Sequence, residues 1–288
     1  MAADIGVKAP LPAPAPVYNW TGFYVGGNAG VSLGTFKTDF NVAPGTFVET
    51  SATTHLPIAT ATIPGFSGFD EVYPGGFIGG GQAGFNWQLS PLWVVGLEGD
   101  FQGADEKEHS NPTQNFSAPI HLVNPAPVAP ALLVGTTALD YTAKIEWFGT
   151  ARVRAGYLFG DGAVFTYVTG GLAYGKVDVE GTSALNVPEF TTITQAFDHS
   201  NVNTGWVVGS GTEGKLANFP GWTYRIEGLY MDLGHLDTNG PGGSFTGSQP
   251  PTIISFTTTS GPVHTHTHFT DTILRLGVSY QFSGGLFH

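Results

Sequence analysis

A strict two-residue alternation near the end of the sequence constrains the fold more than any other feature of this 288-residue chain. Residues 271–282 read DTILRLGVSYQF, so that Thr272 and five apolar or aromatic residues share one parity. The other parity carries Asp271, Arg275, a glycine, an isoleucine and small polar groups. Because successive side chains of a strand point to opposite faces, this pattern predicts a β-strand between two unlike environments.

Seven further stretches favour strands in the same way, at about residues 21–33, 76–89, 93–102, 141–157, 164–177, 203–216 and 222–233. The connections alternate between long segments and short turns along the chain. That alternation is expected when all short turns lie at one end of a barrel and all long loops at the other. We therefore predict an all-β fold, an eight-stranded antiparallel up-and-down transmembrane β-barrel with four long outer loops and three short turns, in which the last strand pairs with the first.

The composition helps to decide which face of the predicted barrel is inside. Charged residues make up only 11% of the chain, against roughly 25% in soluble domains, and no run of 18 apolar residues is present to form a spanning helix. A soluble barrel with its apolar face inside is the alternative. It would expose too few charges to solvent, and its aromatic side chains would overfill an eight-stranded interior. We therefore expect the aromatic face to point outward into lipid.

Two residue sets follow from this orientation. The inward parity holds a charge-balanced interior network of Glu98, Asp100, Lys144, Glu146, Arg152, Arg154, Glu213, Lys215, Arg225, Glu227, Asp271 and Arg275. The outward parity places an aromatic girdle near the short turns, formed by Trp87, Trp93, Tyr157, Trp222, Tyr280 and Phe282.

The termini differ in composition from the predicted barrel, which we place at residues 19–282. Residues 1–18 form a Pro/Ala-rich leader, and Ala2-Ala3-Asp4 resembles the remnant that follows a secretory cleavage site, although no signal peptide is present in this sequence. Residues 283–288 form a short tail. Alternating runs at 56–63 and 252–258 indicate additional hairpins within the long loops.

Several function classes are disfavoured by the residues present. The chain has no cysteine, which excludes thiolate metal sites, and its net charge of −12 argues against a nucleic-acid partner. No GxSxG motif occurs and no histidine falls within a predicted strand, so we expect no enzymatic activity. If the membrane is the outer membrane of a Gram-negative cell, the acidic loops would lie beside lipopolysaccharide phosphates, where divalent cations can bridge like charges; a solvated acidic face is the alternative.

The segment VHTHTH is the candidate site for a divalent metal or haem. His264, His266 and His268 share one face if the segment is extended, about 7 Å apart. Two of them could bind one ion if the strand bends and another loop supplies a further ligand. The alternative is an exposed loop rich in Thr and His, and no other cofactor is predicted.

Five motifs carry a resemblance to a known family: WTGFYVGGNAG (20–30), WFGTARVRAGY (147–157), YVTGGLAYG (167–175), GWVVGSGTE (205–213) and the closing LRLGVSYQF. They resemble the alpha-proteobacterial small outer-membrane β-barrel proteins, called porin-family or outer membrane immunogenic proteins, which are similar in architecture to the OmpA membrane domain. The resemblance implies a barrel in the outer membrane of a Gram-negative bacterium, surface loops, insertion by the outer-membrane assembly machinery and no catalytic residues. Such barrels usually end on an aromatic residue, and the tail after Phe282 departs from that pattern.

We therefore predict a structural outer-membrane barrel that supports envelope integrity and presents surface loops. Two alternatives remain open at the level of sequence. Interior glycines such as Gly84 and Gly156 could leave water-filled gaps and make the barrel a narrow porin for small solutes. The loop histidines could make it a surface binding module for metal or haem. The sequence does not predict an oligomeric state.

Overall fold

The computed structural model describes residues 18–123, 131–188, 190–216, 218–248 and 254–282. The leader before residue 18 and the tail after residue 282 lie outside the described residues. Within the described ranges the regular structure is entirely β, with strands from β1 to β15. No helix in these ranges is long and apolar enough to cross a membrane.

One continuous circuit of antiparallel pairings forms the barrel. It runs through β9 (Leu132–Phe159), β10 (Val164–Val187), β11 (Thr191–Lys215), β12 (Trp222–Gly240), β15 (Val263–Gln281), β1 (Gly22–Val42), β5 (Gly75–Gln88) and β6 (Trp93–Ser110), and returns to β9. The last strand pairs with the first, from Tyr24↔Gln281 to Val42↔Val263. The predicted all-β barrel, with its first and last strands paired, is therefore confirmed.

The short connections have the turn chemistry that the sequence indicates. The β9–β10 turn contains Gly160, Asp161 and Gly162 with φ of +61°, +56° and +83°, so three successive residues adopt the left-handed conformation. Glycine tolerates this region without steric cost, and aspartate is among the few other residues that adopt it. Gly221, at φ +84°, reverses the chain before β12.

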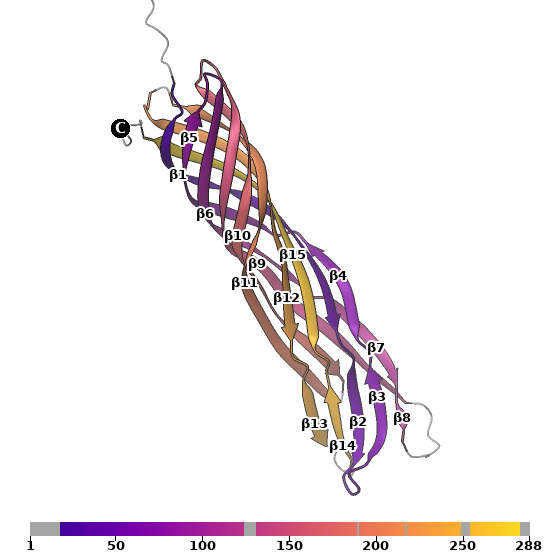
Figure 1. Ribbon diagram of the computed structural model, residues 1–288. Helices are drawn as coiled ribbons and strands as arrows, with labels where there is room; N and C mark the ends of the chain where they lie inside the picture. Colours follow the sequence, from indigo (N-terminus) through magenta and orange to yellow (C-terminus); the bar gives the residue numbers. More distant parts are fainter. Residues whose placement is uncertain (1–17, 124–130, 189, 217, 249–253, 283–288) are drawn as a thin grey trace, which may run out of the picture.

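The four long connections are strand for most of their length, because the barrel strands continue far beyond the expected ends and further strands follow. These are β2 (Gly45–Ser51), β3 (Pro57–Ile63), β4 (Phe66–Val72), β7 (Thr113–Pro119), β8 (His121–Leu122), β13 (Ser244–Ser248) and β14 (Ile254–Thr259). The additional hairpins predicted at 56–63 and 252–258 are confirmed by strands β3 and β14 and their pairings. The expected loop at 178–202 is the continuation of β10 and β11, which pair as far as Val187↔Thr191. Figure 1 shows the result, a barrel drawn out into a long extension that ends in β13, β14, β2, β3 and β8.

The interior of the extension explains why these segments are strands. Inward positions hold apolar side chains such as Phe36, Phe269, Tyr141 and Phe148, which form one large buried cluster, while outward positions hold Thr, Lys, Asp and His. A second buried cluster around Phe47 and its neighbours lies further out. Each fully buried large apolar side chain contributes about 1.5–3 kcal/mol. The apolar residues of these alternating segments therefore pack into a core that continues well beyond the membrane.

The outward face of the barrel defines the part that lies in the membrane. Trp93 and Tyr157 form an exposed aromatic pair near the short turns. Exposed Phe101 and half-buried Trp147 form a second pair further along the same two strands. Ten residues separate Tyr157 from Trp147, which is about 33 Å along a strand and about 25 Å along a barrel axis at the usual tilt. This spacing matches the apolar band of outer-membrane barrels, so the extension lies outside the band.

Candidate functional site

A layer of charged side chains crosses the barrel interior inside this band. Five strands supply it, because alternate residues of β6, β9, β11, β12 and β15 point inward. The layer consists of four basic residues, Arg152, Arg154, Arg225 and Arg275, and four acidic residues, Glu98, Asp100, Glu213 and Glu227, all of them buried. The layer is therefore formally neutral.

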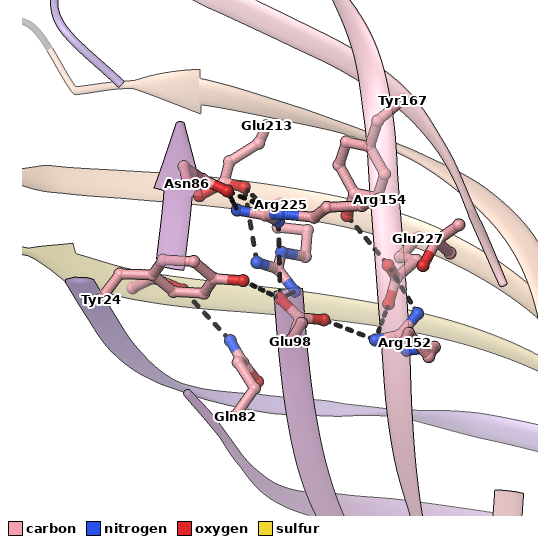
Figure 2. A network of polar contacts seen from close by, with 12 residues as sticks. Tyr24, Gln82, Asn86, Glu98, Arg152, Arg154, Tyr167, Glu213, Arg225 and Glu227 are labelled. Atoms are coloured by element: carbon pink, nitrogen blue, oxygen red, sulfur yellow. Dashed lines mark hydrogen bonds and ion pairs between the residues drawn. The ribbon is translucent and has the colours of Figure 1, made fainter. Parts of the chain in front are cut away.

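Glu98 is the central acceptor of the layer (Figure 2). Its Oε2 lies 2.6 Å from Arg225 Nη1, and its Oε1 lies 2.5 Å from Arg152 Nη2. Tyr24 also donates its hydroxyl to Oε2 at 2.5 Å. Charge-assisted hydrogen bonds of this kind are about twice as strong as neutral ones. One carboxylate thus joins β1, β6, β9 and β12 across the lumen.

A second focus lies at Glu227. Arg275 donates from Nε to Glu227 Oε2 at 2.7 Å and from Nη2 to Asp100 Oδ2 at 2.8 Å. Arg152 donates to the same two acids at 3.1 and 3.0 Å, so both arginines bridge both carboxylates. Tyr167 donates its hydroxyl to Glu227 Oε1 at 2.9 Å. The acids are therefore held by several donors each.

Arg154 forms the edge of the layer on the short-turn side. Its Nη1 lies 3.0 Å from Glu213 Oε2, and Asn86 Oδ1 accepts from its Nε at 3.0 Å and its Nη2 at 2.8 Å. The guanidinium also lies over the ring of Tyr24, 4.5 Å from its centroid. Below it, Trp20 is buried and donates its indole N–H to the Gly162 carbonyl at 2.8 Å. Trp20 is thereby fixed at the short-turn end of the barrel.

Four residues that the sequence placed in the interior network lie elsewhere. Asp271 is inside the barrel but apart from the layer, beside Glu106. Lys215 lies at the short-turn end, where it hydrogen-bonds Gln281 and covers the ring of Trp20. Lys144 and Glu146 lie outside the barrel lumen, which corrects the prediction for these two residues; there Lys144 Nζ is 3.6 Å from Asp178 and Lys176 Nζ is 2.7 Å from Glu146.

A β-bulge in β9 causes the error at Lys144 and Glu146. Lys176 of β10 pairs with Trp147 while the next residue, Val177, pairs with Ile145, so Glu146 is an extra residue in β9. The extra residue reverses the parity, because the inward side chains are Ala143 and Ile145 before it and Phe148 and Arg152 after it. A prediction from strict alternation assumes that no residue is inserted, so it assigned Lys144 and Glu146 to the wrong face.

Other participants were not identified from the sequence. Tyr167 lies on a stretch that is apolar on both parities, so its inward direction was not apparent. Tyr24 and Asn86 are on the polar parity of their strands, which is the one signal that could have indicated them.

The six girdle residues expected from the sequence all lie on the outer surface, and Trp222 and Tyr280 form an aromatic pair with ring centroids 5.5 Å apart.

The candidate metal-binding histidines lie on the outward face of β15, in the extension. His264, His266 and His268 each place a ring nitrogen 2.6–3.0 Å from a side-chain oxygen of β12, namely Asn239, Asp237 and Asp232 respectively. The ring of His235 stacks on both His266 and His268, with centroids 4.5 and 4.2 Å away. Across the described ranges, no group of three His, Cys, Asp or Glu residues is arranged to hold a metal ion.

An antiparallel barrel with a charged interior, and with an apolar outer band between two levels of aromatic side chains, defines an outer-membrane β-barrel protein. Residues 7–282 match the family model for the outer membrane protein beta-barrel domain, and the chain belongs to this family.

The chain is also similar in sequence to two curated outer-membrane proteins. The chain is 34% identical to the 31 kDa outer-membrane immunogenic protein of Brucella melitensis biotype 1, over 98% of this chain and 93% of that protein. It is 25% identical to the 22 kDa outer membrane protein of Rhizobium leguminosarum bv. viciae, over 80% and 72% of the two chains. Among solved structures, the outer membrane protease OmpT of Escherichia coli aligns with a TM-score of 0.34 and 11% identity, over 89% and 97% of the chains.

Proposed function

We propose that this protein is a closed structural barrel, which anchors in the outer membrane and presents its extension outside the cell without catalysing a reaction. The neutral ion-pair layer is the observation that carries this proposal. Arg152, Arg154 and Arg225 lie within 3.4 Å of their carboxylate partners and are almost fully buried, so the lumen is occupied by side chains at this level.

Layers above and below the ion pairs support the same function. On the short-turn side the buried cluster of Trp20, Val94, Leu158, Phe165 and Tyr167 fills the lumen. On the other side, the large apolar cluster begins at Ile78, Phe148 and Ile273. An ion passing through would have to cross apolar, ionic and apolar layers in turn. Eight-stranded interiors are generally filled in this way.

The interior glycines do not support the alternative of a narrow porin. A Cβ on Gly84 would overlap the hydroxyl of Tyr24, and one on Gly156 would overlap the Thr166 carbonyl. A Cβ on Gly209 would overlap the Gly228 carbonyl of the neighbouring strand. These glycines allow close packing of strands and side chains, which is their usual role at curved or crowded positions in a sheet. They are therefore an argument for a filled interior.

Recordings in planar bilayers test the closed barrel. The refolded wild type is expected to show no steady conductance at ordinary salt. Arg152→Ala is expected to raise conductance, since it removes a side chain from the lumen and leaves three carboxylates short of a partner. Well-resolved steady openings of the wild type that Arg152→Ala leaves unchanged would refute the closed barrel and favour a small-solute porin.

We further propose that lipid and lipopolysaccharide are the partners of the outward face. Just beyond Trp147, the partly exposed cations Lys144 and Lys176 lie among Glu146, Asp178 and Glu180. Such a mixed cluster at the membrane surface can meet lipopolysaccharide phosphates through lysine directly and through divalent cations at the acids. Replacing both lysines by glutamine should weaken binding of purified lipopolysaccharide to the refolded barrel, while unchanged binding would argue against this contact.

A further inference from the structure

Two buried carboxyl groups lie inside the barrel beyond the ion-pair layer, at the base of the extension. Glu106 of β6 and Asp271 of β15 are each only 1% exposed. Neither carboxyl makes a well-aligned hydrogen bond within the described residues, although the backbone N–H groups of Leu33 and Thr272 lie beside Asp271. The sequence pattern assigned Glu106 to a loop and Asp271 to the ion-pair network, so this pair emerges only from the fold.

The backbone between them allows the two side chains to approach. In the pairing order β1 and β5 separate β15 from β6, and Gly34 of β1 pairs with Asp271. A Cβ on Gly34 would lie 3.2 Å from Glu106 Oε2, and one on Gly76 of β5 would lie 2.9 Å from Glu106 Cγ. Glu106 therefore extends across bare glycine backbone to reach the opposite carboxyl.

Ser32 completes the group. It lies on β1, two residues before Gly34, and is fully buried. Its hydroxyl is placed beside both carboxyls, yet makes no well-aligned hydrogen bond to a protein group. Three side chains from three strands thus direct only oxygen atoms toward one another.

The charge of this group is not balanced by the protein around it. The four arginines of the ion-pair layer already match four acids, and Ile273 separates Asp271 from Arg275 on the inward face of β15. Phe269 lies on the other side of Asp271, and Ile145 pairs with Glu106, so the flanking side chains of these strands are apolar and bring no cation. Burying a carboxylate costs several kcal/mol unless it is paired or coordinates a metal.

We propose that Glu106, Asp271 and Ser32 bind a hard divalent cation, Ca²⁺ or Mg²⁺, inside the barrel. Such ions prefer oxygen ligands, and a charge of +2 neutralises both carboxylates, whereas one shared proton would leave a buried negative charge. The described chain offers no third acidic or imidazole ligand, so backbone carbonyls and water complete the coordination. The cation would join β6, β1 and β15 where the membrane barrel continues into the extension.

Calcium and magnesium titrations of the refolded protein test the site. Wild type freed of metal with EDTA is expected to bind added Ca²⁺ or Mg²⁺ in calorimetry and to unfold at a higher temperature with the ion. Glu106→Gln and Asp271→Asn should each weaken this binding at least tenfold. Glu108→Gln, on the same strand but exposed, is the matched control and should leave binding at this site unchanged.

Both test variants remove a buried charge with little change of shape, and this gives the design a second readout. In EDTA we expect Asp271→Asn to unfold at a higher temperature than wild type, because the repulsion between two carboxylates is gone. In saturating Ca²⁺ the order should reverse. Two results would overturn the proposal. If Glu108→Gln loses as much cation affinity as Glu106→Gln, the ions bind at the surface. If the wild type binds neither ion and its stability depends on this pair only through pH, the two carboxyls share a proton instead.

Discussion

Replacing Arg152 by methionine removes the guanidinium that bridges Glu98, Asp100 and Glu227 while keeping an apolar chain of similar length. The layer changes from four cations and four anions to three and four, so one negative charge is left buried without compensation. Breaking a buried ion pair from one side costs about 3–5 kcal/mol. We expect Arg152→Met to lower the free energy of unfolding by that amount.

Urea unfolding of the refolded barrel in detergent micelles measures this change. Lys144→Met is the matched control, because Lys144 lies on the same strand, carries the same charge and also contacts acidic residues, but with 25% of its side chain exposed. Partly exposed pairs contribute about 0–1 kcal/mol. Adding Glu227→Gln to Arg152→Met restores three charges of each sign and should recover about 1 kcal/mol or more. Equal effects of Arg152→Met and Lys144→Met, or additive loss in the double variant, would refute the reasoning about charge balance.

Three further predictions concern the two ends of the molecule and its outer face. Protease added to intact cells should cut at the exposed turn around His55 and not at the 160–163 turn; cleavage at 160–163 without permeabilisation would reverse the orientation. Trp20→Ala should cost about 3–5 kcal/mol in urea unfolding, since it opens a cavity and leaves the Gly162 carbonyl without its donor; a loss below about 1 kcal/mol would mean that Trp20 is not fixed at the short-turn end. Burial and the neighbouring imidazoles of His268 and His266 hold the pKa of His235 below its usual range. Its contribution to stability is therefore present above that range and is lost as pH falls through about 6.5. Protection of the backbone amides near residue 235, relative to the intrinsic exchange rate at each pH, should therefore fall at pH 5 in the wild type but not in His235→Asn.

The alternation in the sequence was sufficient to predict the barrel, because a two-residue period that separates lipid-facing from polar residues fits few other folds. The same pattern also placed Glu98, Arg152 and Arg275 on the inward face. It failed at Lys144 and Glu146, where an inserted residue in β9 reverses the parity without any local signal.

The extension and the carboxyl pair needed three-dimensional information. Outside the membrane the outward positions become polar, so the alternation there resembles that of an ordinary Thr-rich loop. Only the pairing of distant strands reveals the apolar side chains such as Phe36 and Phe269 as a core. Glu106 sits in an acidic run, DEKE, that is typical of a solvated surface, and its burial depends on glycines of β1 and β5 far away in the sequence.

The sheet at the far end of the extension determines what another molecule can meet there. Its neighbouring strands β14, β2, β3 and β8 come from near residues 254, 45, 57 and 121, held together by backbone pairing. Leu132 and Trp147 on β9 are separated by 15 residues, about 50 Å along a strand, so this sheet stands well away from the bilayer. A macromolecule that meets this end of the molecule would therefore touch a discontinuous surface, and a linear peptide copied from any one segment would reproduce only part of it.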